Sequence, residues 1–270
     1  MITKLRRSAR RVGQTMSAFD NGTSVLAGMA GNRLRGRPEE LTFRLPGAGS
    51  IICPNRPGAR VPVYEVFAED AYRLEWFLDG MASSPGADGS LTALDIGGHI
   101  GCFAVAFART FPGSRVDAYE ASPTTAAYLS RNITANGLDD RVRCHPRAVS
   151  AERGTLEFAD NAAGSALNGL TAPRGAATVQ VEAITFADAV AAAGGAVDVV
   201  KIDTEGAEYD IVLGSAPADW SGVRRVVLEY HDVPGHGRKE LEDFFTEAGL
   251  TVIRHEPVAP NLGTLWLSRG

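Results

Sequence analysis

The fold of this 270-residue chain is decided by one stretch, Leu94-Asp95-Ile96-Gly97-Gly98-His99-Ile100-Gly101. An apolar strand ends there in a carboxylate, and a glycine-rich turn leads into an apolar helix that we expect from Cys102 to about Thr110. Glycines let a backbone approach a ligand because no Cβ intervenes, and the free N–H groups of a helix N-terminus attract negative charge. A dinucleotide fingerprint would read G-x-G-x-x-G, whereas these glycines stand at 97, 98 and 101. The turn alone leaves an ordinary strand-to-helix connection as an open alternative.

The next predicted strand, residues 115–120, ends in Glu120. In doubly wound sheets an acidic residue at this place accepts hydrogen bonds from a ribose diol. Ser122 and Pro123 then favour a helix start, with serine as the N-cap and proline in the first turn. We expect this helix to run to about Asn136. Strand, glycine turn, helix, strand and glutamate together predict a site for a nucleoside cofactor.

A third segment identifies a family. Residues 197–208 read V-D-V-V-K-I-D-T-E-G-A-E, which resembles the K-I-D-x-E-G-x-E signature of FkbM-type methyltransferases. The glycine turn also resembles the D-x-G-x-x-x-G motif of S-adenosylmethionine-dependent methyltransferases. Three further segments follow in that family's order: Tyr119-Glu120-Ala121-Ser122-Pro123, Asn132-x-x-x-Asn136 and Arg225-Val226-Val227-Leu228-Glu229-Tyr230-His231. The family usually has Ala-Asn where this chain has Gly98-His99. The resemblance covers roughly residue 64 to the C-terminus.

This resemblance implies an α/β fold, a doubly wound and mostly parallel seven-stranded sheet of the Rossmann-like class I methyltransferase type. We expect that domain at 64–270, preceded by an N-terminal extension at 1–63. It further implies S-adenosylmethionine as cofactor and an O-methylated small-molecule acceptor, such as a sugar or specialised metabolite of bacterial biosynthesis. The predicted cofactor-binding residues are Asp95, Gly97, Gly98, His99, Gly101, Glu120, Ala121, Ser122 and Asp203.

Strands and helices alternate along the predicted domain, which is typical of a parallel sheet with crossover helices. Core strands are expected near 91–96, 115–120, 141–149, 197–203, 224–231, 250–255 and 263–268. Helices are expected near 70–81, 102–110, 124–136, 186–193, 206–214 and 239–248. The last two strands have no helix between them, so we expect them to pair antiparallel. Extra strands at 155–160 and 178–184 flank a loop, 161–175, that is either a lid or a surface connection. Short strands are expected at 41–45 and 50–53.

Ligands of open α/β sheets bind over the carboxyl ends of the strands. There the chain places Asp203 with Glu205, and Glu229 with His231. His231 is the first candidate for a general base, since an imidazole titrates near pH ~6.5; Glu205 is the second and Asp203 the third catalytic candidate. Alternatives remain open, with Glu205 as a helix cap and Glu229 as a backbone anchor. Glu208 is expected to be structural or at the rim.

Metal chemistry is a competing interpretation of the same segment. His231, Asp232 and His236 contain ligands suited to zinc, and Asp203 with Asp232 would suit magnesium. However, Pro234 and two glycines make this stretch a loop, so the histidines do not share a helix face. We therefore predict no metal.

Composition restricts the function further. Hydrophobic residues make up 44% of the chain, charged residues 22%, and the net charge is −5, which disfavours nucleic acid and anionic membranes as partners. Three scattered cysteines argue against a disulfide framework and suit a reducing cytoplasm. No apolar run follows the basic N-terminus as in a signal peptide. Instead, Leu5, Val12, Met16 and Phe19 recur at helical spacing, compatible with packing on the domain or in a homodimer. An NAD-dependent oxidoreductase, a nucleic-acid methyltransferase and a catalytically silent cofactor-binding partner protein remain as alternatives.

Overall fold

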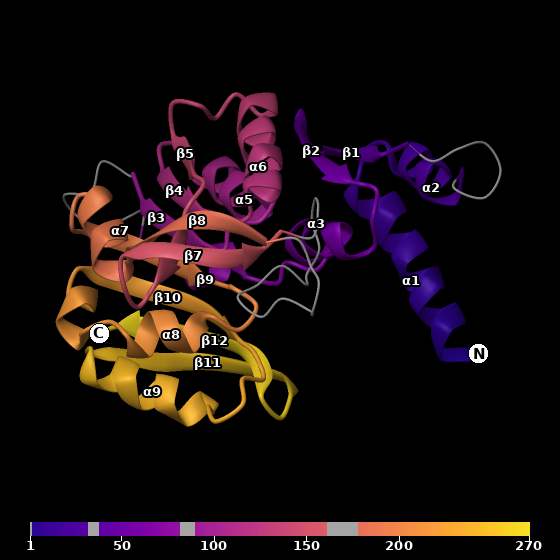
Figure 1. The fold of residues 1–270 in the computed structure, drawn as a ribbon. Helices are drawn as coiled ribbons and strands as arrows, with labels where there is room; N and C mark the ends of the chain where they lie inside the picture. The colour runs from indigo at the N-terminus through magenta and orange to yellow at the C-terminus, as the bar shows by residue number, and fades with distance from the viewer. Residues whose placement is uncertain (1, 32–37, 82–89, 161–177) are drawn as a thin grey trace.

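The computed structural model describes residues 2–31, 38–81, 90–160 and 178–270 (Figure 1). A central sheet has helices on both faces, and the N-terminal helices lie at one side of it (Figure 1). The strands of this sheet are β3 (Thr92–Ile96), β4 (Arg115–Tyr119), β5 (Val142–His145), β9 (Val197–Ile202), β10 (Val223–Tyr230), β11 (Leu250–Ala259) and β12 (Leu262–Arg269). Within the described ranges, no helix has the length and apolar character that a membrane crossing requires.

The strand order is β11-β12-β10-β9-β3-β4-β5. The five strands from β10 to β5 are parallel to one another, whereas β12 is antiparallel to both β10 and β11. The expected doubly wound, mostly parallel seven-stranded sheet is therefore confirmed, including its antiparallel last strand. Chain order reverses on either side of β3, and this topological switch point is where such sheets bind ligands.

The crossover helices lie close to their expected positions. They are α5 (Cys102–Thr110), α6 (Pro123–Ala135), α7 (Phe186–Ala192), α8 (Glu208–Leu213) and α9 (Arg238–Glu247). Ser122 caps α6 as expected, its hydroxyl accepting a hydrogen bond from the Thr125 N–H. Helix α8 begins two residues later than expected, because Glu205 and Gly206 have φ of +54° and +113° and cannot join a right-handed helix.

Two hydrophobic clusters cover the two faces of the sheet. Alternate residues of β3 belong to different clusters, as the two-residue period of a strand requires. Ala93 packs in the cluster that contains α5, whereas Leu94 and Ile96 pack in the cluster that contains α8 and α9. Asp95, between them, is fully buried without being apolar, which marks it as a residue that needs a charged partner.

The strand expected at 141–149 is wrong as one element. It divides into β5 and β6 (Ala148–Ser150), because Pro146 has no N–H to continue a ladder. Strand β6 instead pairs with β8 (Thr178–Thr185), which also pairs with β7 (Gly154–Ala159), in a second, three-stranded sheet. The extra strands are thus confirmed, while the predicted loop between them, 161–175, lies outside the described residues.

The N-terminal extension shares one hydrophobic cluster with the central sheet. It contains α1 (Ile2–Ala18), α2 (Gly22–Ala30), β1 (Glu40–Leu45), β2 (Gly49–Pro54) and the beginning of α3 (Val61–Phe67), whereas α4 (Leu74–Phe77) comes after its expected end at residue 63. The side-chain amides of Asn132 and Asn136, which lie on and next to α6, attach this extension to that helix of the sheet domain. Asn132 accepts a hydrogen bond from the Ile52 N–H at 2.7 Å, and Asn136 accepts one from the Ser50 N–H at 3.0 Å.

The continuous helix expected at 70–81 is also wrong. Only the four-residue α4 forms there, because Asp70 and Arg73 both have φ of +50°. The longer helix α3 precedes it, with a proline in its first turn, a signal that the sequence contained. This difference matters because α3 places Glu65 at the wall of a cavity.

Candidate active site

A cavity of about 360 Å³ opens over the carboxyl ends of β3, β4, β9 and β10. Its floor is formed by the turns that follow these strands, and α3 and the second sheet supply its sides. Carboxylates predominate among its charged lining residues. Within the described part of the chain these are Glu65, Glu120, Asp203, Glu205, Glu229 and Asp232, against a single arginine, Arg147. A cavity with this charge balance favours a cationic ligand.

The glycine turn is shaped by its protein neighbours. A Cβ at Gly97 would lie 1.8 Å from the carbonyl oxygen of Asp203, and Gly97 itself has φ of +80°. A Cβ at Gly98 would lie 2.8 Å from the Leu129 side chain of α6. The glycine at 97 therefore lets the end of β3 contact the end of β9, and its expected approach to a ligand stays a prediction.

Asp95 and Lys201 form a buried pair beneath this turn. The Lys201 ammonium lies 3.1 Å from an Asp95 carboxylate oxygen and donates a hydrogen bond to the Gly97 carbonyl at 2.6 Å. Both side chains are almost completely buried, where a charge needs a partner. Asp95 does not line the cavity, so it acts on the turn through Lys201. The signal for Lys201 was present, since a lysine in a buried apolar strand is rare unless it is paired.

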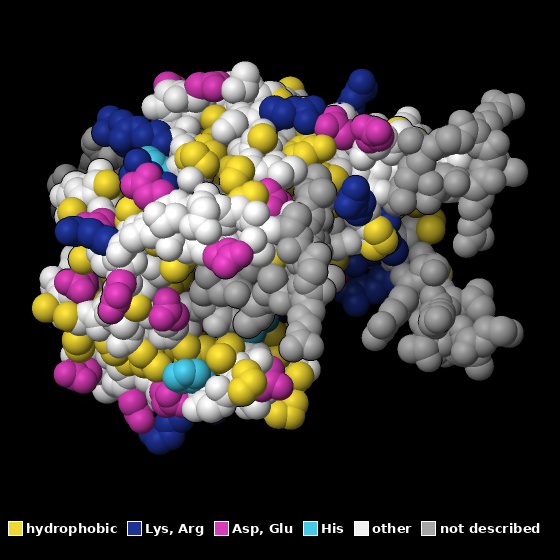
Figure 2. Space-filling view, viewed as in Figure 1, with side chains coloured by type: hydrophobic (Ala, Val, Ile, Leu, Met, Phe, Trp, Pro, Cys, Tyr) yellow, Lys and Arg dark blue, Asp and Glu magenta, His cyan; other side chains and the backbone are white. Residues whose placement is uncertain are grey.

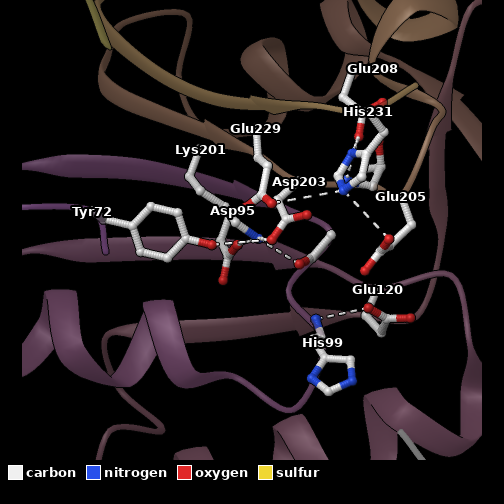
Figure 3. Close-up of polar contacts among 12 residues, drawn as sticks. Tyr72, Asp95, His99, Glu120, Lys201, Asp203, Glu205, Glu208, Glu229 and His231 are labelled. Atoms are coloured by element: carbon white, nitrogen blue, oxygen red, sulfur yellow. Dashed lines mark hydrogen bonds and ion pairs between the residues drawn. The ribbon is translucent and has the colours of Figure 1, made fainter. Parts of the chain in front are cut away.

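Glu120 binds two backbone N–H groups and also lines the cavity. One carboxylate oxygen accepts from the His99 N–H (Figure 3) and the other from the Ser122 N–H, both at 2.8 Å. Burial raises the pKa of Glu120 to about 7, against the lowering effect of these two hydrogen bonds. A carboxylate has about four acceptor positions, so the side chain keeps capacity for a diol. Burial also lowers the pKa of His99 to about 4, which keeps that imidazole neutral.

His231 is surrounded by carboxylates from three elements (Figure 3). Its Nδ1 lies 2.7 Å from Glu208 of α8, and its Nε2 lies 3.4 Å from Glu205 and 3.9 Å from Glu229 of β10. Burial would lower the pKa of His231, but the hydrogen bond and charge of Glu208, together with Asp203 and Glu205, raise it to about 9. The ring is 17% exposed, so Nε2 is available to the cavity while Nδ1 is occupied.

The carboxylates around His231 lie close to one another and to Asp203. Burial, reinforced by the charge of Asp203, raises the pKa of Glu229 to about 8 and that of Glu65 to about 7. The same two causes raise the pKa of Glu205. Asp203 accepts a hydrogen bond from the Tyr72 hydroxyl at 3.1 Å. Neither Tyr72 nor Glu65 was a predicted site residue, because only the tertiary packing of residues 61–77 brings them to the sheet.

The structure separates the predicted cofactor residues into two groups. Gly97, His99, Glu120, Ala121 and Asp203 line the cavity. Asp95, Gly98, Gly101 and Ser122 are buried behind it, in the turn and at the start of α6. All three catalytic candidates, Asp203, Glu205 and His231, also line the cavity. Glu208 is fully buried, which excludes the rim and leaves the structural position, the other of its two expected places.

The zinc-ligand set considered from the sequence, His231, Asp232 and His236, does not assemble among the described residues. His236 instead lies 3.0 Å from Glu240, and Asp232 accepts a hydrogen bond from Asn261 at 3.0 Å. Among the described residues, one other set comes together: ligand atoms of Asp203, Glu205 and His231 lie within 4.8 Å of one another. The prediction of no metal stays a prediction.

Comparison with known proteins agrees with the geometry. The family model of the methyltransferase FkbM domain matches residues 95–250. Over 247 residues the chain is 28% identical to the 31-O-demethyl-FK506 methyltransferase FkbM of Streptomyces tacrolimicus, which covers 80% of this chain and 90% of that protein. Over 192 residues it is 27% identical to the methyltransferase sdnD of Sordaria araneosa, covering 60% of this chain and 74% of that one.

The fold has a counterpart among solved structures. An S-adenosylmethionine-dependent methyltransferase from Agrobacterium tumefaciens superposes with a TM-score of 0.52 at 13% identity, covering 87% of this chain and 71% of that one. This likeness concerns the fold alone, and the sequence match carries the assignment. The chain belongs to the FkbM family of methyltransferases, which use S-adenosylmethionine.

Proposed function

We propose that this methyltransferase methylates a hydroxyl oxygen of a small molecule in a bacterial biosynthetic pathway. One observation carries the proposal: the Nε2 atom of His231 faces the cavity while Nδ1 is held by a buried carboxylate. A hydroxyl acceptor must lose a proton as its oxygen is methylated, and a positioned imidazole is suited to accept it. The name of the Streptomyces relative, which specifies a 31-O-demethyl compound, supports the same chemistry.

The residues of the cavity fit the cofactor of the family. Bound S-adenosylmethionine supplies a methyl group on a cationic sulfur, and its transfer leaves a neutral thioether. We assign Glu120 to the ribose hydroxyls, because its two oxygens are already oriented by the His99 and Ser122 N–H groups. Asp203 and the other lining carboxylates provide negative charge for the sulfonium. Asp95, with Lys201, supports the turn from below.

The roles of the acceptor-side residues follow from their distances. His231 is the proposed base, and the carboxylates of Glu205 and Glu229, at 3.4 and 3.9 Å from its Nε2, stabilise the imidazolium that forms. Much of the rate then comes from orientation of the acceptor in the part of the cavity that α3 and β10 line.

Other properties of the proposal concern partners and location. We propose no nucleic-acid partner, since the net charge is −5 and basic side chains alternate with acidic ones over the sheet domain on the face drawn in Figure 2. A cytoplasmic location agrees with three free cysteines, of which Cys53 and Cys102 are buried.

The test is methyl transfer to defined hydroxyl acceptors. The wild-type protein is incubated with S-adenosylmethionine and either 31-O-demethyl-FK506 or simple sugars, and S-adenosylhomocysteine formation is measured. With an acceptor in hand, His231→Ala should lower turnover by roughly 10²–10⁴-fold, the usual contribution of a general base, while cofactor affinity stays near wild type. Transfer to amines but never to hydroxyls would overturn the proposal. Cofactor binding without turnover on any acceptor would favour a catalytically silent binding protein.

A further inference from the structure

We propose that Glu208 is the positioning residue for His231, and that the two form a buried dyad which accepts the proton of the acceptor. This inference rests on the proposed function, because it assigns a partner to the proposed base. Glu208 does not line the cavity, and its side chain is fully buried. The His231 ring lies between it and the cavity (Figure 3). Glu208 therefore acts through the imidazole and not on a reactant.

The carboxylate of Glu208 is held by its own chain segment. The same oxygen that contacts His231 accepts hydrogen bonds from the N–H groups of Thr204 and Gly206, at 3.2 and 3.1 Å. The left-handed backbone of Glu205 and Gly206 turns these groups toward the first turn of α8. A strained backbone conformation at a non-glycine residue persists only where the surrounding contacts hold it in place. The anchoring is independent of His231, so the carboxylate is in place before the ring is charged.

A fixed carboxylate at Nδ1 selects one form of the neutral ring. It accepts a hydrogen bond from Nδ1–H over the 2.7 Å contact, which leaves the lone pair on Nε2. That lone pair lies on the side of Glu205, Glu229 and the cavity. The dyad thus places the lone pair of Nε2 where the hydroxyl group of the methyl acceptor can reach it. A carboxylate orients a functional imidazole in the same way at other sites.

The charge balance of the reaction agrees with this arrangement. The acceptor oxygen forms a bond to the methyl carbon and gives its proton to Nε2 of His231. The electrons of the broken carbon–sulfur bond stay on sulfur, which becomes neutral. One positive charge therefore leaves the sulfur and arrives on the imidazole, where Glu208 is already in contact. Glu208 keeps its charge throughout and stabilises the imidazolium by electrostatics.

Four carboxylates from three elements face or influence the ring: Asp203 and Glu205 after β9, Glu208 on α8 and Glu229 on β10. After the opposing effect of burial, the largest influence on the His231 pKa is Glu208, as hydrogen-bond acceptor and as charge. Replacing this carboxylate by an amide of the same shape should therefore lower the proton affinity of the ring. A merely structural role would leave that affinity unchanged.

The experiment is a histidine titration by NMR on the full-length protein labelled with ¹³C and ¹⁵N in histidine. The His231 signal is identified by its absence in His231→Asn. In the wild type we expect titration near pH 9, and in Glu208→Gln a midpoint at least one pH unit lower. Turnover of Glu208→Gln should fall about 10–100-fold, as for other residues that orient a functional imidazole. The acidic limb of its pH–rate profile should move to lower pH with the NMR midpoint.

The chain contains a matched control. Glu240 contacts the Nδ1 atom of His236 at 3.0 Å on the exposed side of α9, outside the cavity. Glu240→Gln should leave both the His231 midpoint and turnover unchanged. An unchanged His231 midpoint in folded Glu208→Gln would overturn the proposal.

A second readout needs no variant of Glu208. The ¹⁵N shifts of the wild-type ring above its midpoint report which nitrogen carries the proton. A proton on Nδ1 supports the dyad, whereas a proton on Nε2 overturns it, even if Glu208→Gln does not fold. These measurements are made without cofactor or acceptor. They therefore decide the dyad separately from His231→Ala turnover, which decides the proposed function.

Discussion

The two walls of the cavity use carboxylates in opposite ways. At the glycine turn, Asp95 is paired with a lysine and Glu120 binds two backbone N–H groups. At the opposite wall, Glu205 and Glu229 share one histidine, and the charge of Asp203 adds to burial in raising the pKa of Glu65. At this first wall, which we call the completed wall, both carboxylates already have partners from the chain itself. The second has an excess of negative charge, which a sulfonium or an imidazolium would balance.

This difference separates preorganised binding from chemistry. A group whose hydrogen bonds are already made holds its geometry and costs little to reorganise when a ligand binds. A group whose neighbouring charges are not neutralised changes its pKa when a charged ligand binds, and perturbed pKa values of this kind are typical of reacting centres. Four substitutions or treatments test the comparison.

The largest effect is expected at the completed wall, from Gly97→Ala. The new Cβ would meet the Asp203 carbonyl oxygen at 1.8 Å, and we expect a loss of at least ~3 kcal/mol in the free energy of unfolding, measured by urea denaturation. Gly137→Ala is the control. Gly137 also has a positive φ, +62°, but among the described residues, its chain neighbours apart, no atom lies within 4 Å of the place that a methyl group would take, so only the backbone cost of ~1–2 kcal/mol applies. Equal losses in the two variants would refute the role assigned to Gly97.

Glu120→Gln tests whether the completed wall binds the cofactor. An amide keeps the shape but removes the charge, so S-adenosylmethionine affinity should fall by about 1.5–3 kcal/mol, the range for hydrogen bonds to charged groups. Calorimetry at pH 8 is suitable, because it lies above the Glu120 pKa of about 7. Glu247→Gln, at an exposed carboxylate at the end of α9, should bind like the wild type. Unchanged affinity for S-adenosylmethionine in folded Glu120→Gln would exclude Glu120 from the cofactor site.

The unbalanced wall predicts a pH dependence that distinguishes cofactor from product. Glu65 and Glu229, with pKa values of about 7 and 8, gain negative charge as pH rises from 6 to 9. His231 loses positive charge near the upper end of this range. Both changes favour the cationic sulfonium, so affinity for S-adenosylmethionine should rise about tenfold relative to neutral S-adenosylhomocysteine. Parallel pH profiles for the two ligands would contradict this, and Glu229→Gln should reduce the difference.

The smallest effect is expected from removing metal ions. Asp203, Glu205 and His231 approach one another closely, but the proposed mechanism uses the Nε2 lone pair of His231 for a proton. Dialysis against EDTA should therefore change turnover by less than about twofold, since a lost Lewis acid would cost several kcal/mol. Loss of activity that Mg²⁺ or Mn²⁺ restores would assign these three residues to a metal instead.

The sequence alone predicted the class of fold and the ends of most core strands. Apolar strands with β-branched residues, the glycine turn and the cap at Ser122 are local signals, because each depends only on residues that are close together in the chain. The sequence-based prediction was wrong for the helix expected at 70–81, because the backbone conformation there does not follow the helical spacing of the apolar residues. Tyr72, Trp76 and Phe77 have helical spacing, yet positive φ at Asp70 and Arg73 interrupts the helix.

Two features of the site were decided by tertiary structure. Glu65 lines the cavity and Tyr72 reaches Asp203 because α3 and the segment after it pack against α5 and the sheet, a contact between distant segments that no local pattern encodes. Glu208 was visible as the last letter of the family signature, but its partner His231 lies 23 residues away. The parallel pairing of β9 with β10 brings the turn before α8 beside the end of β10. Local chemistry thus determined which residues could react, and sheet topology decided which of them meet.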